Sequence, residues 1–367
     1  MSNLSSITQI TLADTHAVAI GAGVLGTGGG GNTYLGRIWL EQELTERGSS
    51  CQILSADEVP DDGYVCAIGG MGAPTVSIEK LPQGQEMVNA LRALEEHIQA
   101  PLVAMVCGEI GGSNALRPLI CGLQMGLPVI DGDGMGRAFP ELQMDTFSIG
   151  GVSASPMALA DCHGNVVIFH EIDSPLRAEQ YGRVLTIEMG GSAALAMPLM
   201  NGRTMKNHII RNTLSLAHQL GTVVLDARRQ GAEPAEAVAA AGHGRVLFRG
   251  KITDVERLTV QGFARGQLQL VSFNDPNDQM EIVFQNENLV AWHNGEIVCT
   301  VPDLITILNL DDGEPIGTEM LRYGLRVAVL GMPAPKELKT HDALAVVGPQ
   351  AFGYDVPFQP MPGDLIG

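Results

Sequence analysis

The chain has 367 residues, of which 45% are hydrophobic and 17% charged, so it holds enough apolar material for a large folded core. Acidic residues outnumber Lys and Arg by 41 to 22, and the formal net charge is −19. This balance argues against nucleic acid and anionic membranes as partners, because both require a cationic face. A chain of this length is expected to form two domains.

The cellular compartment follows from the amino terminus and the cysteines. Residues 1–9 are polar and lack the basic and apolar regions of a signal peptide, and no apolar stretch is long enough for a membrane span. The six cysteines contain no CxxC pair, so we expect reduced and mostly buried thiols. We therefore predict a cytoplasmic protein that acts on a small molecule, and we expect it to be a homo-oligomer.

The N-terminal half alternates between helices and apolar strands. Helices are expected at residues 15–25, 33–47, 86–99 and 116–125, and strands at 64–68, 101–107 and 128–130. Apolar strands separated by helices predict a mostly parallel sheet with helices on both faces. Because each strand leads into a glycine-rich loop, these loops should gather at the carboxyl edge of the sheet, where ligands bind in such folds.

The second half has a different pattern. Residues 184–189 are expected to form a strand and residues 204–229 one long helix. Short β-type runs follow, and Asn294-Gly295 between two of them indicates a hairpin. We therefore predict an α/β domain over residues 1–165, with glycine-rich ligand loops, and a β-rich (α+β) domain with one long helix over residues 166–367.

The glycine-rich segment at residues 21–32 has two interpretations. Residues 21–26 formally match GxGxxG, but they follow a helix cap instead of a strand, so no nicotinamide or flavin cofactor is expected. The residues after them can form an anion cradle ahead of a helix, or simply a tight turn where two elements cross closely. The residues predicted to bind substrate here are Thr27, Gly28, Gly29, Gly30, Gly31 and Asn32.

Carboxylates follow the third predicted strand. Asp131 and Asp133 stand one residue apart and could hold a divalent metal or divide the roles of acid and base. Arg137 could keep one of them ionised or bind a substrate carboxylate. The alternative is a solvated turn capped by the Asp side chains.

A further carboxylate, Glu109, stands where the second strand of these units should end, which suits a general base or a metal ligand beside Asp131. Asn114 nearby could stabilise a developing oxyanion. Cys107 lies on the apolar strand, where a buried and inert thiol is favoured over a nucleophile. The histidines form no zinc pattern, and the chain has neither a GxSxG elbow nor a P-loop.

The long motifs resemble a bacterial family associated with S-methyl thiohydantoin desulfurases, and the resemblance spans nearly the whole chain. The matching segments are Gly21 to Gly31, Tyr34 to Gly36, Glu109 to Gly112, Asp131 to Met144, Gly244 to Lys251, Pro302 to Ile305, Leu321 to Val329, Val347 to Pro349 and Phe352 to Tyr354. The resemblance implies an α/β domain, a β-rich domain, and hydrolysis of an S-methyl thiohydantoin to a hydantoin with release of methanethiol. Related cyclic amides are further candidate substrates, because the family is associated with hydantoinases and oxoprolinases.

The hypothesis that follows assigns roles from the residues. Water activated by Glu109, by Asp131 or by a metal between them would attack the ring carbon that carries sulfur, and Asp133 would assist protonation. Two alternatives stay open: an accessory subunit of a hydantoinase or oxoprolinase system, and a nucleotide-dependent enzyme that uses the glycine loops for phosphate.

Overall fold

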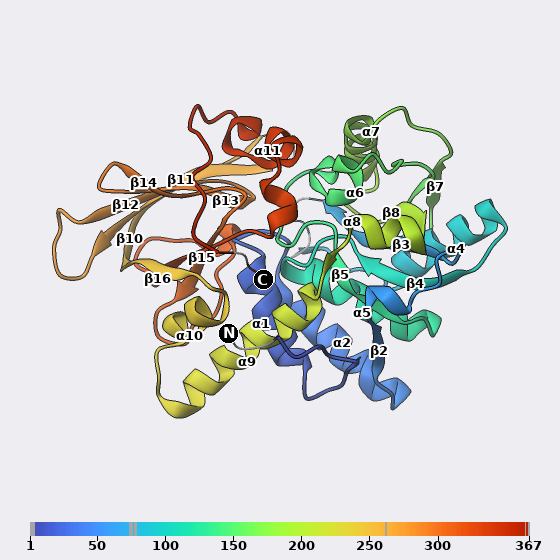
Figure 1. Ribbon diagram of the computed structural model, residues 1–367, viewed down its shortest axis with the longest axis horizontal. Helices are drawn as coiled ribbons and strands as arrows, with labels where there is room; N and C mark the ends of the chain where they lie inside the picture. Colours follow the sequence, from blue (N-terminus) through green and yellow to red (C-terminus); the bar gives the residue numbers. More distant parts are fainter. Residues whose placement is uncertain (1–3, 73–75, 77–78, 261–262, 364, 366–367) are drawn as a thin grey trace.

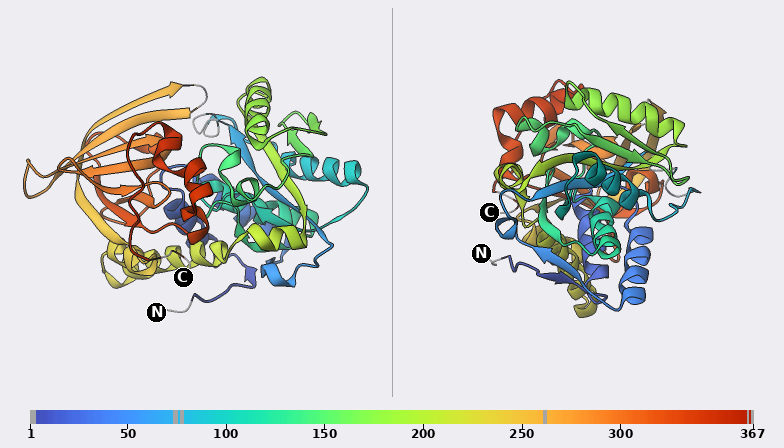
Figure 2. Two further views of the ribbon diagram at one scale, coloured as in Figure 1. Left: turned by 45° about the horizontal axis from the view of Figure 1, so that its top comes forward. Right: turned by 90° about the vertical axis from the view of Figure 1, so that its right-hand side faces the viewer.

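The computed structural model describes residues 4–72, 76, 79–260, 263–363 and 365 (Figure 1). Two β-sheets form the molecule, one of nine strands and one of seven, and helices α1 and α9 lie between them (Figures 1 and 2). The expected combination of an α/β domain and a β-rich domain is confirmed.

The nine-stranded sheet has a parallel centre and antiparallel flanks. Strands β2, β5, β4 and β3 are parallel to one another, whereas β1, β8, β6, β7 and β9 pair antiparallel to their neighbours. In spatial order the strands are β1 (Gln9–Ile10), β2 (Cys51–Leu54), β5 (Val129–Asp133), β4 (Leu102–Cys107), β3 (Tyr64–Gly72), β8 (Ser192–Asn201), β6 (Met157–Ala160) and β7 (Val166–Phe169), with β9 (Ile210–Arg211) beside β5.

Helices cover both faces of this sheet. Helices α4 (Glu86–Ile98) and α5 (Leu116–Met125) pack on the face that carries Cys66 and Ile68 of β3. The opposite face is covered by α6 (Thr146–Ile149), α7 (Pro175–Glu188) and α8 (Gly202–His208). Successive side chains of β3 point to opposite faces of the sheet, and helices bury both faces. Apolar residues are therefore needed at consecutive positions of this strand.

The seven-stranded sheet is antiparallel throughout. Its spatial order is β14 (Glu296–Thr300), β13 (Glu287–His293), β12 (Gln279–Gln285), β11 (Phe263–Ser272), β10 (Arg245–Val260), β16 (Arg326–Met332) and β15 (Leu304–Asn309). The hairpin expected at Asn294-Gly295 joins β13 to β14, and both residues have positive φ angles, as a two-residue hairpin turn requires.

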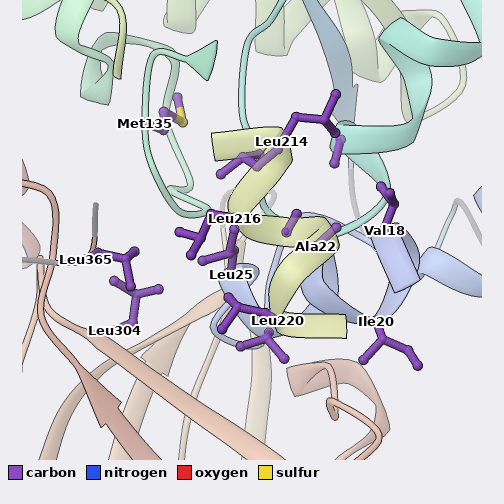
Figure 3. Packing of buried hydrophobic residues seen from close by; sticks show 14 of the residues in the cluster. Val18, Ile20, Ala22, Leu25, Met135, Leu214, Leu216, Leu220, Leu304 and Leu365 are labelled. Atoms are coloured by element: carbon purple, nitrogen blue, oxygen red, sulfur yellow. The ribbon is translucent and has the colours of Figure 1, made fainter. Parts of the chain in front are cut away.

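Helices α1 (Thr15–Leu25) and α9 (Thr213–Gln230) cross at very short range. A Cβ on Gly21 would lie 1.7 Å from the carbonyl oxygen of Ala217, and one on Gly221 would lie 1.7 Å from that of Ala17. Glycine at both positions therefore lets the two backbones touch. Leu25 of α1 packs with side chains of α9 in the largest hydrophobic core, together with residues of both sheets (Figure 3).

Helix α2 (Thr33–Arg47) begins and ends where expected, and the other remaining elements are short or peripheral. These others are α10 (Pro234–Ala241), α11 (His341–Val347) and the 3-10 helices Ala56–Glu58, Gly112–Ala115, Leu142–Met144, Thr318–Met320, Lys336–Lys339 and Pro349–Phe352. Within the described ranges, no helix is both long and apolar enough to cross a membrane. Five of the six free cysteines are buried, and Cys162 is half-buried.

The strand expected at residues 184–189 is wrong, because these residues belong to α7 and its C-terminal end. Ser174 caps the helix by accepting the N–H of Arg177, and a proline at the first helical position fixes its start. Val184 and Ile187 are exposed on the helix surface instead of being buried in a sheet. The β-branched residues indicated a strand, but the helix begins well before them.

The single helix expected over residues 204–229 is also wrong. The chain leaves α8, forms β9 against β5, and starts α9 after Asn212, whose φ angle is 62°. The carboxylate of Asp131 accepts the N–H groups of Leu214 and Ser215 and so caps the new helix.

The nine-stranded sheet continues beyond residue 165, where the first domain was expected to end. Strands β7, β8 and β9 belong to the nine-stranded sheet, although they follow residue 165. The seven-stranded sheet begins at Arg245 with β10.

Candidate active site

A cavity of about 660 Å³ opens at the carboxyl edge of the parallel strands. Its wall includes residues of three glycine-rich loops, which follow α1, β4 and β5, and the glycines at the end of β3, which continues to Gly72 instead of ending at residue 68 as expected. Glu287 of β13 and Asn286, which precedes it, complete the wall. A site between two domains at the carboxyl ends of parallel strands is a common location for small-molecule binding.

Glu109 lies directly beyond β4 and faces this cavity. Its Oε1 accepts a hydrogen bond of 2.8 Å from Asn114 Nδ2, and its Oε2 accepts one of 3.1 Å from the backbone N–H of Phe139. Only 8% of the residue is exposed, and burial raises the pKa of the carboxyl to about 7. Glu109 is therefore suited to exchange a proton near neutral pH.

Glu287 opens β13 and enters the same cavity from the second sheet. The residue is 2% exposed, and its Oε2 has no hydrogen-bond partner among the described residues. Burial raises the pKa of Glu287 well above its ordinary value, and the nearby charge of Glu109 raises it further. The protonated form of this carboxyl is therefore favoured more strongly than that of an exposed glutamate, and in that form it can donate a hydrogen bond or a proton.

Asn114 holds Glu109 in place. Its Oδ1 accepts the N–H of Gly70 at 3.0 Å, while its Nδ2 donates to Glu109. Both ends of the amide are thus engaged, and the geometry assigns this side chain to positioning Glu109 instead of to an oxyanion hole.

The glycine-rich loop between α1 and α2 is divided between two tasks. Its first part contacts β13 and the 3-10 helix Thr318–Met320: the carbonyl of Thr27 accepts the N–H of Asn288, and that of Gly28 accepts the N–H of Thr318, each at 2.8 Å. A Cβ on Gly29 would lie 1.9 Å from Glu287 Oε1, so glycine lets this carboxyl approach the loop. The close crossing that the sequence left open is therefore present here.

The second part of the loop faces the cavity, which Gly30, Gly31 and Asn32 line. The Asn32 side chain accepts the N–H of Tyr34 and caps α2. A Cβ on Gly112 would lie 2.3 Å from the carbonyl carbon of Gly30, so two glycine-rich loops also touch. Contact of this part with a ligand remains a prediction.

The expectation that Arg137 binds a substrate carboxylate is not supported, because its donors are already used. The residue is 0% exposed and is absent from the cavity wall. The guanidinium donates to Thr27 Oγ1 and to four backbone carbonyls, those of Ala138, Asn288, Pro302 and Asp303. Arg137 therefore joins the two domains.

Asp131 and Asp133 also lie outside the cavity wall. The Asp131 carboxylate accepts two N–H groups and a hydroxyl at the start of α9, and Asp133 accepts the N–H groups of Ile110, Met135 and Gly136. Their oxygens thus organise the backbone, and the catalytic role expected for them is not supported. A metal ion between Asp131 and Glu109 is not supported either. Within the described part of the chain, no group of three or more His, Cys, Asp or Glu residues could hold a metal ion.

Two residues of the cavity wall were missed from the sequence, namely Glu287 and Arg117. A carboxylate beside Gln285 and Asn286, within an apolar β-type run, was a signal for Glu287. Arg117 stands three residues after Asn114, near the start of α5, so the two lie close together along one helical segment.

Fold and cavity together define a two-domain α/β protein with a carboxyl-lined site between its domains. Residues 13–171 match the N-terminal domain of the S-Me-THD-like family, and residues 173–361 match its C-terminal domain. The chain therefore belongs to this family, and the resemblance to S-methyl thiohydantoin desulfurases is confirmed.

A crystal structure of a protein from Chromobacterium violaceum has the same fold. The two are 23% identical with a TM-score of 0.79, and the match covers 96% of this chain and 100% of the other. No sequence among the curated proteins matches this chain at a significant level.

Proposed function

We propose that this protein hydrolyses an S-methyl thiohydantoin to a hydantoin and releases methanethiol. The observation that carries the proposal is the presence of two buried carboxyl groups in one cavity, Glu109 with a pKa raised to about 7 and Glu287 with a pKa raised well above its ordinary value. Carboxyls whose environments separate their pKa values can serve as base and acid in one reaction.

Glu109 is assigned as the general base. At neutral pH a large fraction of this carboxyl is ionised, and Asn114 with the N–H of Phe139 fixes its orientation. It removes a proton from water as the water oxygen attacks the ring carbon that carries sulfur. A carbon–oxygen bond forms, and the ring carbon becomes tetrahedral.

Glu287 is assigned as the general acid. Its proton passes to the sulfur as the carbon–sulfur bond breaks, so that methanethiol leaves as a neutral molecule. As the ring carbonyl forms, the hydroxyl proton passes to the ring nitrogen that received the electron pair of the C=N bond during the attack. The proton taken up by Glu109 then returns to Glu287 through solvent, which restores both carboxyl groups. The sum is one water consumed, one hydantoin and one methanethiol produced, with no change in oxidation state.

The cavity suits a substrate of this kind. Its volume of about 660 Å³ leaves room for a five-membered ring with a substituent. Gly30, Gly31, Gly69 and Gly70 line it, so the backbone can approach the ring closely. Hydrogen bonds from such backbone groups would orient the ring.

The test is methanethiol release by the purified protein from a synthetic S-methyl thiohydantoin, followed with a chromogenic disulfide and with chromatography of the hydantoin. We expect steady release of one thiol per hydantoin. Folded protein that releases no thiol, but copurifies with a hydantoinase and raises its activity, would contradict the proposal and support the accessory-subunit alternative.

A further inference from the structure

Three cationic side chains line the cavity within the described residues, and two of them are engaged by the protein. Lys80 Nζ donates to the carbonyl of Met189 at 3.0 Å. Arg183 forms an ion pair with Glu179 and donates to the carbonyl of Pro140. The third is Arg117, for which no hydrogen bond or ion pair is formed with any of the described residues.

Arg117 reaches the cavity wall because a glycine leaves space for its guanidinium. A Cβ on Gly70 would lie 2.5 Å from the Cζ and NH1 atoms of Arg117, so any larger residue at this position would displace the guanidinium. Gly70 also donates its N–H to Asn114, which in turn donates to Glu109. Gly70 thus lies beside Arg117 and also fixes Asn114, which orients the proposed base Glu109.

Among the residues that the structure describes, no acid neutralises Arg117 through direct contact. The carboxylate of Glu86 accepts the N–H groups of Gln83 and Gly84, at 2.6 Å and 2.8 Å, and acts on Arg117 only through its charge. Glu109 likewise acts through its charge alone. A desolvated guanidinium without a hydrogen-bonded anion is unfavourable, and a ligand that supplies the anion removes this penalty.

We propose that Arg117 selects substrates whose ring carries an anionic substituent, namely a carboxylate, which it binds through two parallel N–H donors. The proposal rests on the function proposed above and names the substrate class for the same site. Bidentate binding would fix the rotation of the ring as well as its position, because the planar guanidinium matches a carboxylate. Arg117 is therefore assigned as a specificity residue, distinct from the acid and the base.

The kinetic test compares two S-methyl thiohydantoins, one with a carboxylate on its side chain and one with the matching primary amide. For the carboxylate, Arg117→Gln is expected to lower kcat/KM about 100-fold, mainly through KM. For the amide, kcat/KM should change less than about threefold. Arg92→Gln, at an exposed arginine of α4, is the control and should leave both unchanged.

Equal losses for both substrates would overturn the proposal, because they would assign Arg117 to the transition state or to the ionisation of the glutamates. No loss for either would overturn it as well. Thermal unfolding of Arg117→Gln establishes that the variant is folded, and Arg117→Lys, which keeps the charge but not the paired donors, should recover only part of the affinity for the carboxylate.

A second measurement separates this proposal from the proposed function. Calorimetry records binding of the hydantoin product that bears the carboxylate, which requires no turnover. Binding that weakens about 100-fold in Arg117→Gln would support an anion subsite even if no thiol is released. Equal affinity of the wild type and Arg117→Gln for this product would overturn the subsite even if thiol release is observed.

Discussion

Glu109 and Glu287 enter one cavity from different sheets, and their hydrogen bonding is unequal. Both oxygens of Glu109 accept hydrogen bonds, whereas Glu287 Oε2 has no partner among the described residues. Hydrogen bonds favour the ionised form, so they hold the pKa of Glu109 closer to neutral while burial and the neighbouring charge raise that of Glu287 further. Burial, the charge of Glu109 and the unequal hydrogen bonding thus separate the pKa values of the proposed base and acid.

The first prediction concerns stability and pH. Burial raises the pKa of Glu109 in the folded state to about 7, above the ordinary value of 4.5, so the folded state binds this proton more tightly. Its stabilising contribution is full below pH 4.5 and is lost as pH rises through 7, by about 3 kcal/mol at most. Urea denaturation at pH 5 and pH 8 should show a smaller difference for Glu109→Gln than for the wild type. An unchanged difference would contradict the raised pKa.

The second prediction concerns Asp131. Because its carboxylate caps α9, Asp131→Asn should lower the free energy of unfolding by about 1–3 kcal/mol while turnover of the folded variant stays near that of the wild type. Chemical denaturation and thiol release measure the two effects. A loss of turnover of about 100-fold at unchanged stability would instead restore the catalytic role first expected from the sequence.

Local patterns in the sequence were sufficient for much of the first domain. The spacing of apolar residues predicted α2 at its observed bounds, and Glu109 was identified because it follows a buried strand. Asp131 and Asp133 have the same local signals, but their oxygens are taken by N–H groups of segments up to 84 residues away, such as the start of α9. Which carboxylate stays free depends on these distant donors.

Glu287 could not be placed from local patterns for a similar reason. It reaches the cavity because Asn288 pairs with Thr27, far away in the chain, and Gly29 leaves space for its carboxyl. The break at Ile210 between α8 and α9 likewise depends on pairing with β5. Tertiary contacts of this kind override helix propensity.

The third prediction concerns the crossing of α1 and α9. Gly21→Ala would place a methyl group 1.7 Å from the carbonyl oxygen of Ala217, which only a shift of the two backbones can relieve, so a loss of about 3 kcal/mol or more is expected. The control is Gly182→Ala in α7, where the nearest atom is the flexible Met71 sulfur at 3.3 Å, and a change within about 1 kcal/mol is expected. Equal effects in thermal unfolding would contradict the close crossing.

The fourth prediction concerns Cys107. Burial raises the pKa of this thiol well above its ordinary value, and its Sγ donates to the carbonyl of Glu109 at 2.9 Å. Cys107→Ser keeps the donor, so turnover should remain within about threefold of the wild type. Iodoacetamide should modify half-buried Cys162 before Cys107 in the native protein. Rapid modification of Cys107 with loss of activity would indicate a nucleophile instead.

The central claim is that Glu109 and Glu287 act together as base and acid, and a double-mutant cycle on methanethiol release tests it most directly. Glu109→Gln and Glu287→Gln should each lower kcat at least about 100-fold, and the double variant should be little slower than the slower single variant, because water attack and thiol departure are successive steps and the slower of them limits turnover. Glu319→Gln, at a carboxyl with a raised pKa outside the cavity wall, is the control. Near-normal turnover by either single variant, folded and saturated with substrate, would contradict the claim.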